Sequence, residues 1–313
     1  MKYPEKIDLH LHTNVSDGTD SPNEILEQVR RAGIELFSIT DHDDFKGGLV
    51  IRDILTEEDP KFLTGIEFSC KDNEGKYHIL GYGFDPDSEP FREVVETGHR
   101  FRIQKVRARL DLLRDEFGFT FSEEDIEDLL RQHNPGKPHI ANLMVRYGYA
   151  ETKEQAISDY INQLHVKSEY LRPEDAIEGI LAGGGIPVLA HPSYGDGDQL
   201  IMGEEMDSRL RRLTGFGLEG VEAYYSGFTP KITAEVLSFA EKYRLYVTAG
   251  SDYHGKNKLV EIGDNGLSRV SDGAEGVRRF LDSVKFCTRA NLPQASKSTA
   301  GNVSGQAFGQ EKL

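Results

Sequence analysis

The sequence has few cysteines and no long apolar run. No stretch approaches the roughly 20 apolar residues that a bilayer-spanning helix requires, which excludes that class of membrane protein. The two cysteines, Cys70 and Cys287, are too few for a disulfide framework. The first residues contain no apolar core of an export signal. These absences favour a soluble, cytoplasmic protein.

Positive charge is also in short supply, because 37 basic residues face 53 acidic ones and the net charge is −16. Such a balance disfavours a protein that follows long nucleic acid with a basic surface. It does not exclude a phosphorylated substrate, because bound divalent cations invert the local field. We therefore expect a small phosphorylated substrate, no long nucleic acid and no membrane. The oligomeric state is left open.

The first apolar run, residues 7–12, alternates aliphatic and polar side chains. Alternation with period two predicts a β-strand, and it places His10 and His12 on one face of that strand. Neighbouring positions on one face can direct two imidazoles at a single metal ion. The alternative is a pair of solvated histidines on an exposed face. The rest of the chain has to decide between the two.

Strand and helix patterns alternate in both halves of the chain. This alternation implies parallel pairing in an α/β sheet or barrel. Between about residues 89 and 171, however, the pattern is almost entirely helical. We predict a barrel core of residues 1–98 and 172–289, a helical insertion of residues 99–171 lying over one end of it, and a disordered tail of residues 290–313, which has little apolar content.

Side chains with metal-binding chemistry lie at or near the ends of the predicted strands. In parallel α/β proteins these ends share one rim, where active sites are built. The set exceeds what one ion requires and contains no cysteine, so we expect two or three divalent ions, with Mn²⁺ first and Zn²⁺ or Fe²⁺ as alternatives. Taken singly, His78 also fits a core histidine, and Glu67 and Asp252 fit strand-end caps. The candidate ligands are His10, His12, Asp17, His42, Glu67, His78, His191, Asp252 and His254.

The same residues, in order and spacing, resemble the polymerase and histidinol phosphatase (PHP) family. The matching segments are His10–His12 with Ser16–Gly18, Thr40–Asp43, Gly65–Glu67, the strand with His78, Ala190–Pro192 and Ser251–His254. The resemblance implies a distorted (β/α)7 barrel with a cluster of two or three metals, and the complete ligand set favours three. The inserted Gly136–Ala141 and Tyr147–Tyr149 segments resemble the branch that acts on nucleotides and related small phosphates.

The resemblance also implies how the ligands are divided. One metal would take His10, His12, Glu67 and Asp252; a second would take Glu67 as a bridge with His78 and His191; a third would take Asp17, His42 and His254. A water between the metals bound at Glu67 would be the nucleophile. Asp17 is the candidate that protonates the leaving oxygen. His191 and His254 are alternatives for this role, but a metal-bound imidazole donates a proton poorly.

Substrate contacts are predicted near the start of a helix in the insertion. Lys137 and His139 lie at its N-terminus, where backbone N–H groups and the helix dipole favour a phosphate. Arg172 and Tyr194 are weaker candidates for the same pocket. The alternative is that Lys137 is a solvated surface charge and His139 an ordinary first-turn residue.

We therefore predict a phosphoric ester hydrolase, a phosphomonoesterase or phosphodiesterase that uses metal-activated hydroxide. Its substrates would be nucleotide or ribose phosphates, including 3′,5′-bisphosphates and cyclic phosphodiesters. Alternatives are an exonuclease that trims short oligoribonucleotides and a histidinol-phosphate phosphatase. A metal-dependent amidohydrolase is a different class, but no core strand ends in a lysine suited to carboxylation. A purely structural barrel would lack ligands, and none is missing here.

Overall fold

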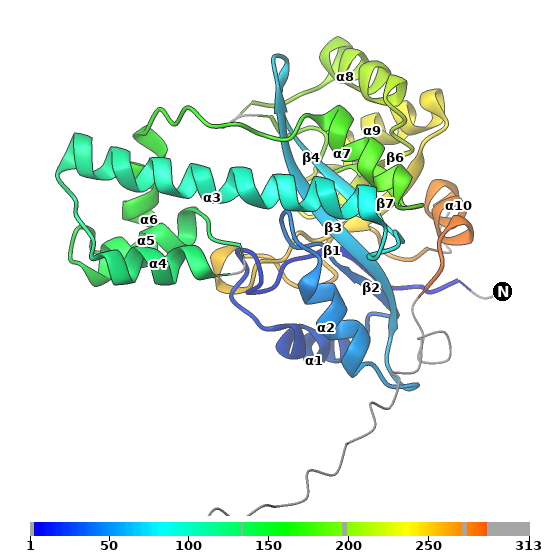
Figure 1. Cartoon of the computed structure of the whole chain (residues 1–313). Helices are drawn as coiled ribbons and strands as arrows, with labels where there is room; N and C mark the ends of the chain where they lie inside the picture. Colours follow the sequence, from blue (N-terminus) through cyan, green and yellow to red (C-terminus); the bar gives the residue numbers. More distant parts are fainter. Residues whose placement is uncertain (1–2, 133, 196–198, 271–273, 287–313) are drawn as a thin grey trace, which may run out of the picture.

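The computed structural model describes residues 3–132, 134–195, 199–270 and 274–286 (Figure 1). Its single sheet runs in the order β1 to β7. The strands are β1 (Ile7–Leu11), β2 (Leu36–Ile39), β3 (Lys61–Asp72), β4 (Gly75–Tyr82), β5 (Ile186–Leu189), β6 (Gly220–Tyr225) and β7 (Tyr246–Gly250). The ends of the sheet also meet, because the amide of Asp252 donates to the carbonyl of His10 at 2.8 Å. The sheet is thus a nearly closed barrel, and the predicted (β/α)7 class is confirmed.

One part of the sheet differs from the parallel pairing expected along the chain. Strand β4 is antiparallel to both β3 and β5. Only two residues separate β3 from β4, and such a connection suits a hairpin, whereas a parallel pair needs a long crossover. As a consequence β3 continues to Asp72, so that Glu67 lies inside the strand and not at its end. His78 pairs with Ser69 across the hairpin, diagonally opposite Glu67.

Helices follow the barrel strands and cover the outside of the barrel (Figure 1). They are α1 (Pro22–Ala32), α2 (Lys46–Ile54), α7 (Pro173–Ala182), α8 (Gly203–Gly215), α9 (Pro230–Tyr243) and α10 (Glu275–Ser283). Helix α1 shows why the sequence predicts where a helix begins and ends. The Ser21 hydroxyl accepts the amide of Glu24 while the Glu24 carboxylate accepts the amide of Ser21, a reciprocal cap. Gly33 ends the helix in the left-handed conformation, with φ of 68°.

The insertion has helices α3 (Glu89–Phe117), α4 (Glu123–Arg131), α5 (Lys137–Arg146) and α6 (Lys153–Gln155), followed by the π turn η1 (Ala156–Tyr160) and the 3-10 turn η2 (Ile161–Gln163). It projects to one side of the barrel (Figure 1). Helix α3 passes through the predicted boundary at residue 98 without a break. Phe91 near its start belongs to the barrel core, and Val106 belongs to a second core within the insertion. The domain division remains a prediction, and residues 290–313 and Cys287 lie outside the described residues.

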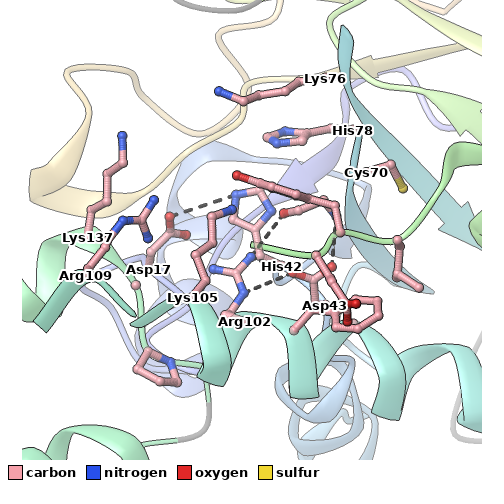
Figure 2. A pocket seen from close by; sticks show the side chains of 18 of the residues that line it. Asp17, His42, Asp43, Cys70, Lys76, His78, Arg102, Lys105, Arg109 and Lys137 are labelled. Atoms are coloured by element: carbon pink, nitrogen blue, oxygen red, sulfur yellow. Dashed lines mark hydrogen bonds and ion pairs between the residues drawn. The ribbon is translucent and has the colours of Figure 1, made fainter. Parts of the chain in front are cut away.

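A cavity of about 420 Å³ lies between α3, α5 and the barrel rim (Figure 2). Arg102 of α3 anchors the insertion beside it, because its Nη2 donates to Asp43 at 2.6 Å and to the Ser69 hydroxyl at 3.1 Å. Within the described part of the chain, no helix is both long and apolar enough to cross a lipid bilayer. The fold thus places a helical wall against one edge of the rim.

Candidate metal centre

Glu67 is the centre of the predicted ligand set. It is fully buried, and both of its carboxylate oxygens face imidazole nitrogens. Oxygen Oε2 approaches three rings and Oε1 approaches two. The distances are 3.3 Å to His10 Nε2, 3.1 Å to His12 Nε2 and 3.2 Å to His42 Nδ1 from Oε2, and 3.0 Å to His78 Nδ1 and 3.3 Å to His191 Nε2 from Oε1. One carboxylate therefore connects five histidines from four parts of the barrel.

Asp252 closes one side of this cluster. Its Oδ1 lies 3.3 Å from His10 Nε2 and 3.2 Å from His12 Nε2. Its other oxygen accepts hydrogen bonds from the Tyr225 hydroxyl at 2.9 Å and the Lys258 ammonium at 2.6 Å. One oxygen is thus left to face the histidines while the other is held in place. His10, His12, Glu67 and Asp252 form a group whose potential ligand atoms lie within 4.8 Å of one another.

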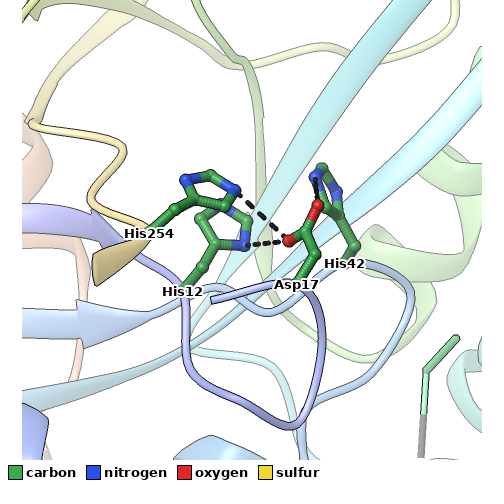
Figure 3. A group of neighbouring side chains, drawn as sticks. All are labelled: His12, Asp17, His42 and His254. Atoms are coloured by element: carbon green, nitrogen blue, oxygen red, sulfur yellow. Dashed lines mark ion pairs between the residues drawn. The ribbon is translucent and has the colours of Figure 1, made fainter. Parts of the chain in front are cut away.

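A second group gathers around Asp17 (Figure 3). The Asp17 carboxylate lies 3.2 Å from His254 Nε2 and 3.9 Å from both His12 Nδ1 and His42 Nε2. The loop that carries it is fixed by Asp41, which accepts the Thr13 amide at 2.8 Å and the Ser16 hydroxyl at 2.6 Å. The nine candidate ligands therefore converge on one rim, as their sequence positions indicated.

The donor atoms themselves test whether cations fit this rim. Several of them are buried and have no hydrogen-bond partner among the described residues, a situation that costs about 1–3 kcal/mol per group in a protein interior. These atoms face one another across the centre of the rim, so bound divalent cations would give all of them a partner. They are His10 Nε2, His12 Nε2, Asp17 Oδ1, His42 Nδ1 and Glu67 Oε2. The set of imidazoles and carboxylates suits hard or borderline ions.

The electrostatics of the rim hold His42 and Glu67 in ligating forms. Burial lowers the pKa of His42 to about 3, in spite of the nearby Glu67 and Asp17 carboxylates, so its ring is neutral and has a lone pair to offer. Burial alone would raise the pKa of Glu67, but the nearby charge of the His10 ring outweighs burial and holds that pKa well below its usual range. Glu67 is therefore a carboxylate at neutral pH. The Glu222, Glu67 and Asp252 carboxylates raise the pKa of His10 well above its usual range, and Asp252 and Glu67 raise that of His12 to about 9, in spite of burial, so a cation would displace a proton from these two rings.

Removing divalent cations with a chelator should lower the melting temperature of the protein by about 10 °C. A site saturated at a thousand times its Kd contributes about 4 kcal/mol to stability, and in a domain of this size each kcal/mol shifts the midpoint by a few degrees. Differential scanning fluorimetry with and without Mn²⁺ measures this shift. The His10→Ala variant should lose much of it, and identical melting curves for wild-type protein with and without Mn²⁺ would contradict the metal centre.

The predicted substrate contacts are not gathered in one place. Lys137 lines the cavity, and its ammonium donates to Asn162 at 2.6 Å. His139 instead accepts the amide of Gly136 at 3.0 Å and so caps the start of its own helix. Arg172 is exposed and paired with Asp175 at 2.5 Å, outside the cavity lining. Tyr194 lines a separate hollow of about 110 Å³, together with His78 and His191.

Sequence reasoning missed three kinds of residue near the rim. Arg102, Lys105 and Arg109 of α3 line the cavity, and their spacing of three and four residues, which places them on one face of a helix, was a visible signal. Lys76 lines it from β4. Glu222 lies in β6 and contacts His10; a carboxylate inside an apolar strand was its only signal.

A nearly closed α/β barrel with six histidines and three carboxylates at one rim defines a metal-dependent hydrolase of the barrel class. The PHP domain model matches residues 8–163. The chain belongs to the PHP family, as its motifs predicted.

Named relatives refine the class. The chain is 29% identical over 259 residues to a phosphoribosyl 1,2-cyclic phosphate 1,2-diphosphodiesterase from Eggerthella lenta, covering 80% of this chain and 94% of that one. It is 26% identical to a 5′-3′ exoribonuclease from Haemophilus influenzae, covering 83% and 94%. It is 25% identical to a 3′,5′-nucleoside bisphosphate phosphatase from Chromobacterium violaceum, covering 79% and 87%.

A solved structure agrees in fold. The crystal structure of a candidate metal-dependent phosphoesterase from Bifidobacterium adolescentis superposes with a TM-score of 0.75 and 27% identity, covering 90% of this chain and 98% of that one. The prediction of a phosphoric ester hydrolase of the PHP family is confirmed at this level.

Proposed function

We propose that the chain hydrolyses phosphate esters of small nucleotides or ribose phosphates that carry a second phosphate group. The observation that carries this proposal is a basic cavity that opens onto the candidate metal ligands in a chain of net charge −16. Asp17, His42 and His78 line it on the barrel side (Figure 2). The basic side chains that line it are Lys76, Arg102, Lys105, Arg109 and Lys137.

The metal scheme is part of the proposal. The nine candidate ligands would hold two or three divalent cations, Mn²⁺ first, in the three sets that the family resemblance implies. The contacts of Glu67 with five histidines support its role as a bridge. Bound cations would polarise a phosphoryl oxygen and lower the pKa of a water. Asp17 lies at the edge of the cavity, but the neighbouring histidines outweigh its burial and hold its pKa well below its usual range, which disfavours the predicted role as donor of a proton to the leaving oxygen.

Within the described part of the chain, two of the basic side chains, Lys105 and Arg109, form no ion pair with an acidic group. Arg102 is neutralised by Asp43 at 2.6 Å. Among the described residues, Arg109 forms no ion pair, and its buried Nε has no hydrogen-bond partner. Burial, followed by repulsion from Arg109 and Arg102, lowers the pKa of Lys105 to about 6. A buried cation such as Arg109 is costly unless it is paired, and an anion beside Lys105 would favour its charged form. This part of the cavity therefore suits an anion that the substrate supplies.

The charge and size of the cavity select among substrate classes. A volume of about 420 Å³ lies in the range of small-molecule sites, and it suits a mononucleotide better than long nucleic acid. The names of the Eggerthella lenta and Chromobacterium violaceum relatives, a cyclic phosphodiesterase and a bisphosphate phosphatase, support the proposal. A histidinol phosphate, with one phosphate and an amine, would leave the basic side chains without a partner.

Trimming of short oligoribonucleotides is the second candidate. The hollow on the other side of His78 contains Tyr194, an aromatic side chain that is 39% exposed next to the predicted ligand His191. Aromatic side chains stack on nucleobases, so this hollow offers a place for the nucleotide beyond the scissile bond. The name of the Haemophilus influenzae relative, an exoribonuclease, agrees with this candidate.

A substrate panel tests the proposal. The Mn²⁺-loaded protein should release phosphate from a 3′,5′-nucleoside bisphosphate with kcat/KM at least about 10-fold above that for the 3′-mononucleotide, because a charged hydrogen bond to the second phosphate contributes about 1.5–3 kcal/mol. The panel should include cyclic ribose phosphates, 5′-phosphorylated dinucleotides and histidinol phosphate. Equal rates for mono- and bisphosphates would overturn the two-phosphate proposal. No hydrolysis beyond that of an Asp252→Ala variant would overturn the hydrolase itself.

A further inference from the structure

Glu222 of β6 touches two predicted ligands without belonging to the ligand set. Its side chain is fully buried. One oxygen, Oε1, lies 3.0 Å from Nδ1 of the His10 ring. The other, Oε2, accepts the backbone N–H of His191 at 2.9 Å. A single carboxylate thus connects β1 with the segment after β5, whose histidine rings approach different oxygens of Glu67.

The contact with His10 decides which ring nitrogen is available. A carboxylate can only accept a hydrogen bond, so a neutral His10 must carry its proton on Nδ1 to donate to Glu222. Its lone pair is then on Nε2. Among the residues that the structure describes, that buried nitrogen has no hydrogen-bond partner, and it lies 3.3 Å from both the Glu67 and Asp252 carboxylates. Carboxylates that hold the second nitrogen of a ligating histidine in this way strengthen metal binding.

The contact with His191 decides where that ring lies. His191 has a φ of 26°, in a region that non-glycine residues rarely adopt. The bond from its amide to Glu222 holds the backbone there. In this conformation the ring Nε2 lies 3.3 Å from Glu67 and 3.2 Å from His78 Nδ1. The same carboxylate therefore orients one ligand on each side of the bridge.

We propose that Glu222 is a positioning residue that raises the metal affinity of the His10 site and the His191 site together. This inference rests on the metal scheme of the proposed function, but not on the identity of the substrate. Because the two oxygens of Glu222 serve the two ligands separately, no single neutral side chain of the same shape can replace it at both.

The Glu222→Gln variant isolates this property. Its amide has one accepting oxygen and one donating NH₂ group. If the oxygen faces His191, the NH₂ faces His10 Nδ1 and favours the tautomer whose Nε2 is protonated and unable to bind metal. If the amide is reversed, the NH₂ meets the N–H of His191, and that loop loses its hydrogen bond. One ligand is misplaced in either orientation.

Titration of the metal-free protein with Mn²⁺, followed by the electron paramagnetic resonance of the free ion, measures the effect. The Glu222→Gln variant should bind Mn²⁺ about 10–100-fold more weakly, the usual effect of losing such a partner. The matched control is Glu219→Gln, a change at an exposed residue just before the same strand, which should bind as the wild type does. Wild-type affinity in Glu222→Gln would overturn the proposal.

A second measurement does not depend on the variant folding. In the Zn²⁺-loaded wild-type protein labelled with ¹⁵N-histidine, the His10 ring should carry its proton on Nδ1, and a ring protonated on Nε2 would overturn the proposal. Neither readout involves turnover. If weakened Mn²⁺ binding were found in a protein that hydrolyses no phosphate ester, the role of Glu222 would stand and the proposed substrate class would fail.

Discussion

The Glu67→Gln variant should lose at least about 10³-fold in kcat/KM for phosphate ester hydrolysis. The change keeps the volume of the side chain and removes its charge. Both Glu67 oxygens face histidine rings, three from one oxygen and two from the other. An amide offers a single oxygen, so it cannot bridge two cations as the carboxylate would. Loss of several kcal/mol of Lewis-acid stabilisation corresponds to a rate decrease of this size.

The same variant should also bind at least one metal ion fewer. Metal analysis after extensive dialysis, together with steady-state kinetics at saturating Mn²⁺, gives the two readouts. The control is Glu74→Gln, in the turn of the same hairpin, where the carboxylate is exposed and pairs with Arg212 at 3.1 Å. It should leave metal content and kcat/KM unchanged. Full metal content with wild-type kcat/KM in Glu67→Gln would refute a bridging role.

The rim was largely predictable from sequence because its residues lie in the strands or in the short segments that follow them. In a barrel of this kind, strands separated by many residues end at one rim, so His10 and His254 could be expected to meet without knowing their distance. The two-residue connection before Gly75 was equally visible, but alternating strands and helices suggested parallel pairing, and the hairpin of β3 and β4 was missed. At that point the short connection determines antiparallel pairing, in spite of the strand–helix alternation elsewhere in the chain.

Other residues could not be placed from sequence because their roles depend on packing between distant segments. Glu222 is 212 positions from His10, and only the barrel brings the two together. The stripe of Arg102, Lys105 and Arg109 has helical spacing, but the surface that it faces is set by how the insertion packs against the rim. Arg172 shows the opposite case. Its position just before a core helix suggested a side chain in the pocket, but the side chain is exposed and pairs with Asp175.

The position of α3 gives the insertion a chemical role. Its first half packs on the barrel and its second half belongs to the insertion core. The basic stripe lies between the two, next to Asp17 and His42 in the same cavity. A helix that is continuous across this junction holds these basic side chains at a fixed place relative to the candidate ligands. In the proposed function the barrel would carry the metal ligands that catalyse hydrolysis, and the insertion would determine which phosphate ester is bound.

Arg109 provides the sharpest test of that division. The Arg109→Met variant should raise KM for a 3′,5′-nucleoside bisphosphate about 10–100-fold, because the second phosphate loses a charged hydrogen bond of about 1.5–3 kcal/mol. KM for the corresponding 3′-mononucleotide and kcat for both should change little, since Arg109 is not among the candidate metal ligands. Initial-rate kinetics on the two substrates, with Mn²⁺ saturating, separates these effects.

The same substitution should not lower the free energy of unfolding of the substrate-free protein. Arg109 is buried, with 9% of its surface exposed, and forms no ion pair among the described residues. Replacing an unpaired buried charge by an apolar side chain of similar length should leave the substrate-free protein equally or more stable. Arg107→Met, at an exposed position on the same helix, is the control and should alter neither KM nor stability. A destabilised Arg109→Met with equal KM changes for both substrates would show that Arg109 supports the helix and does not bind the second phosphate.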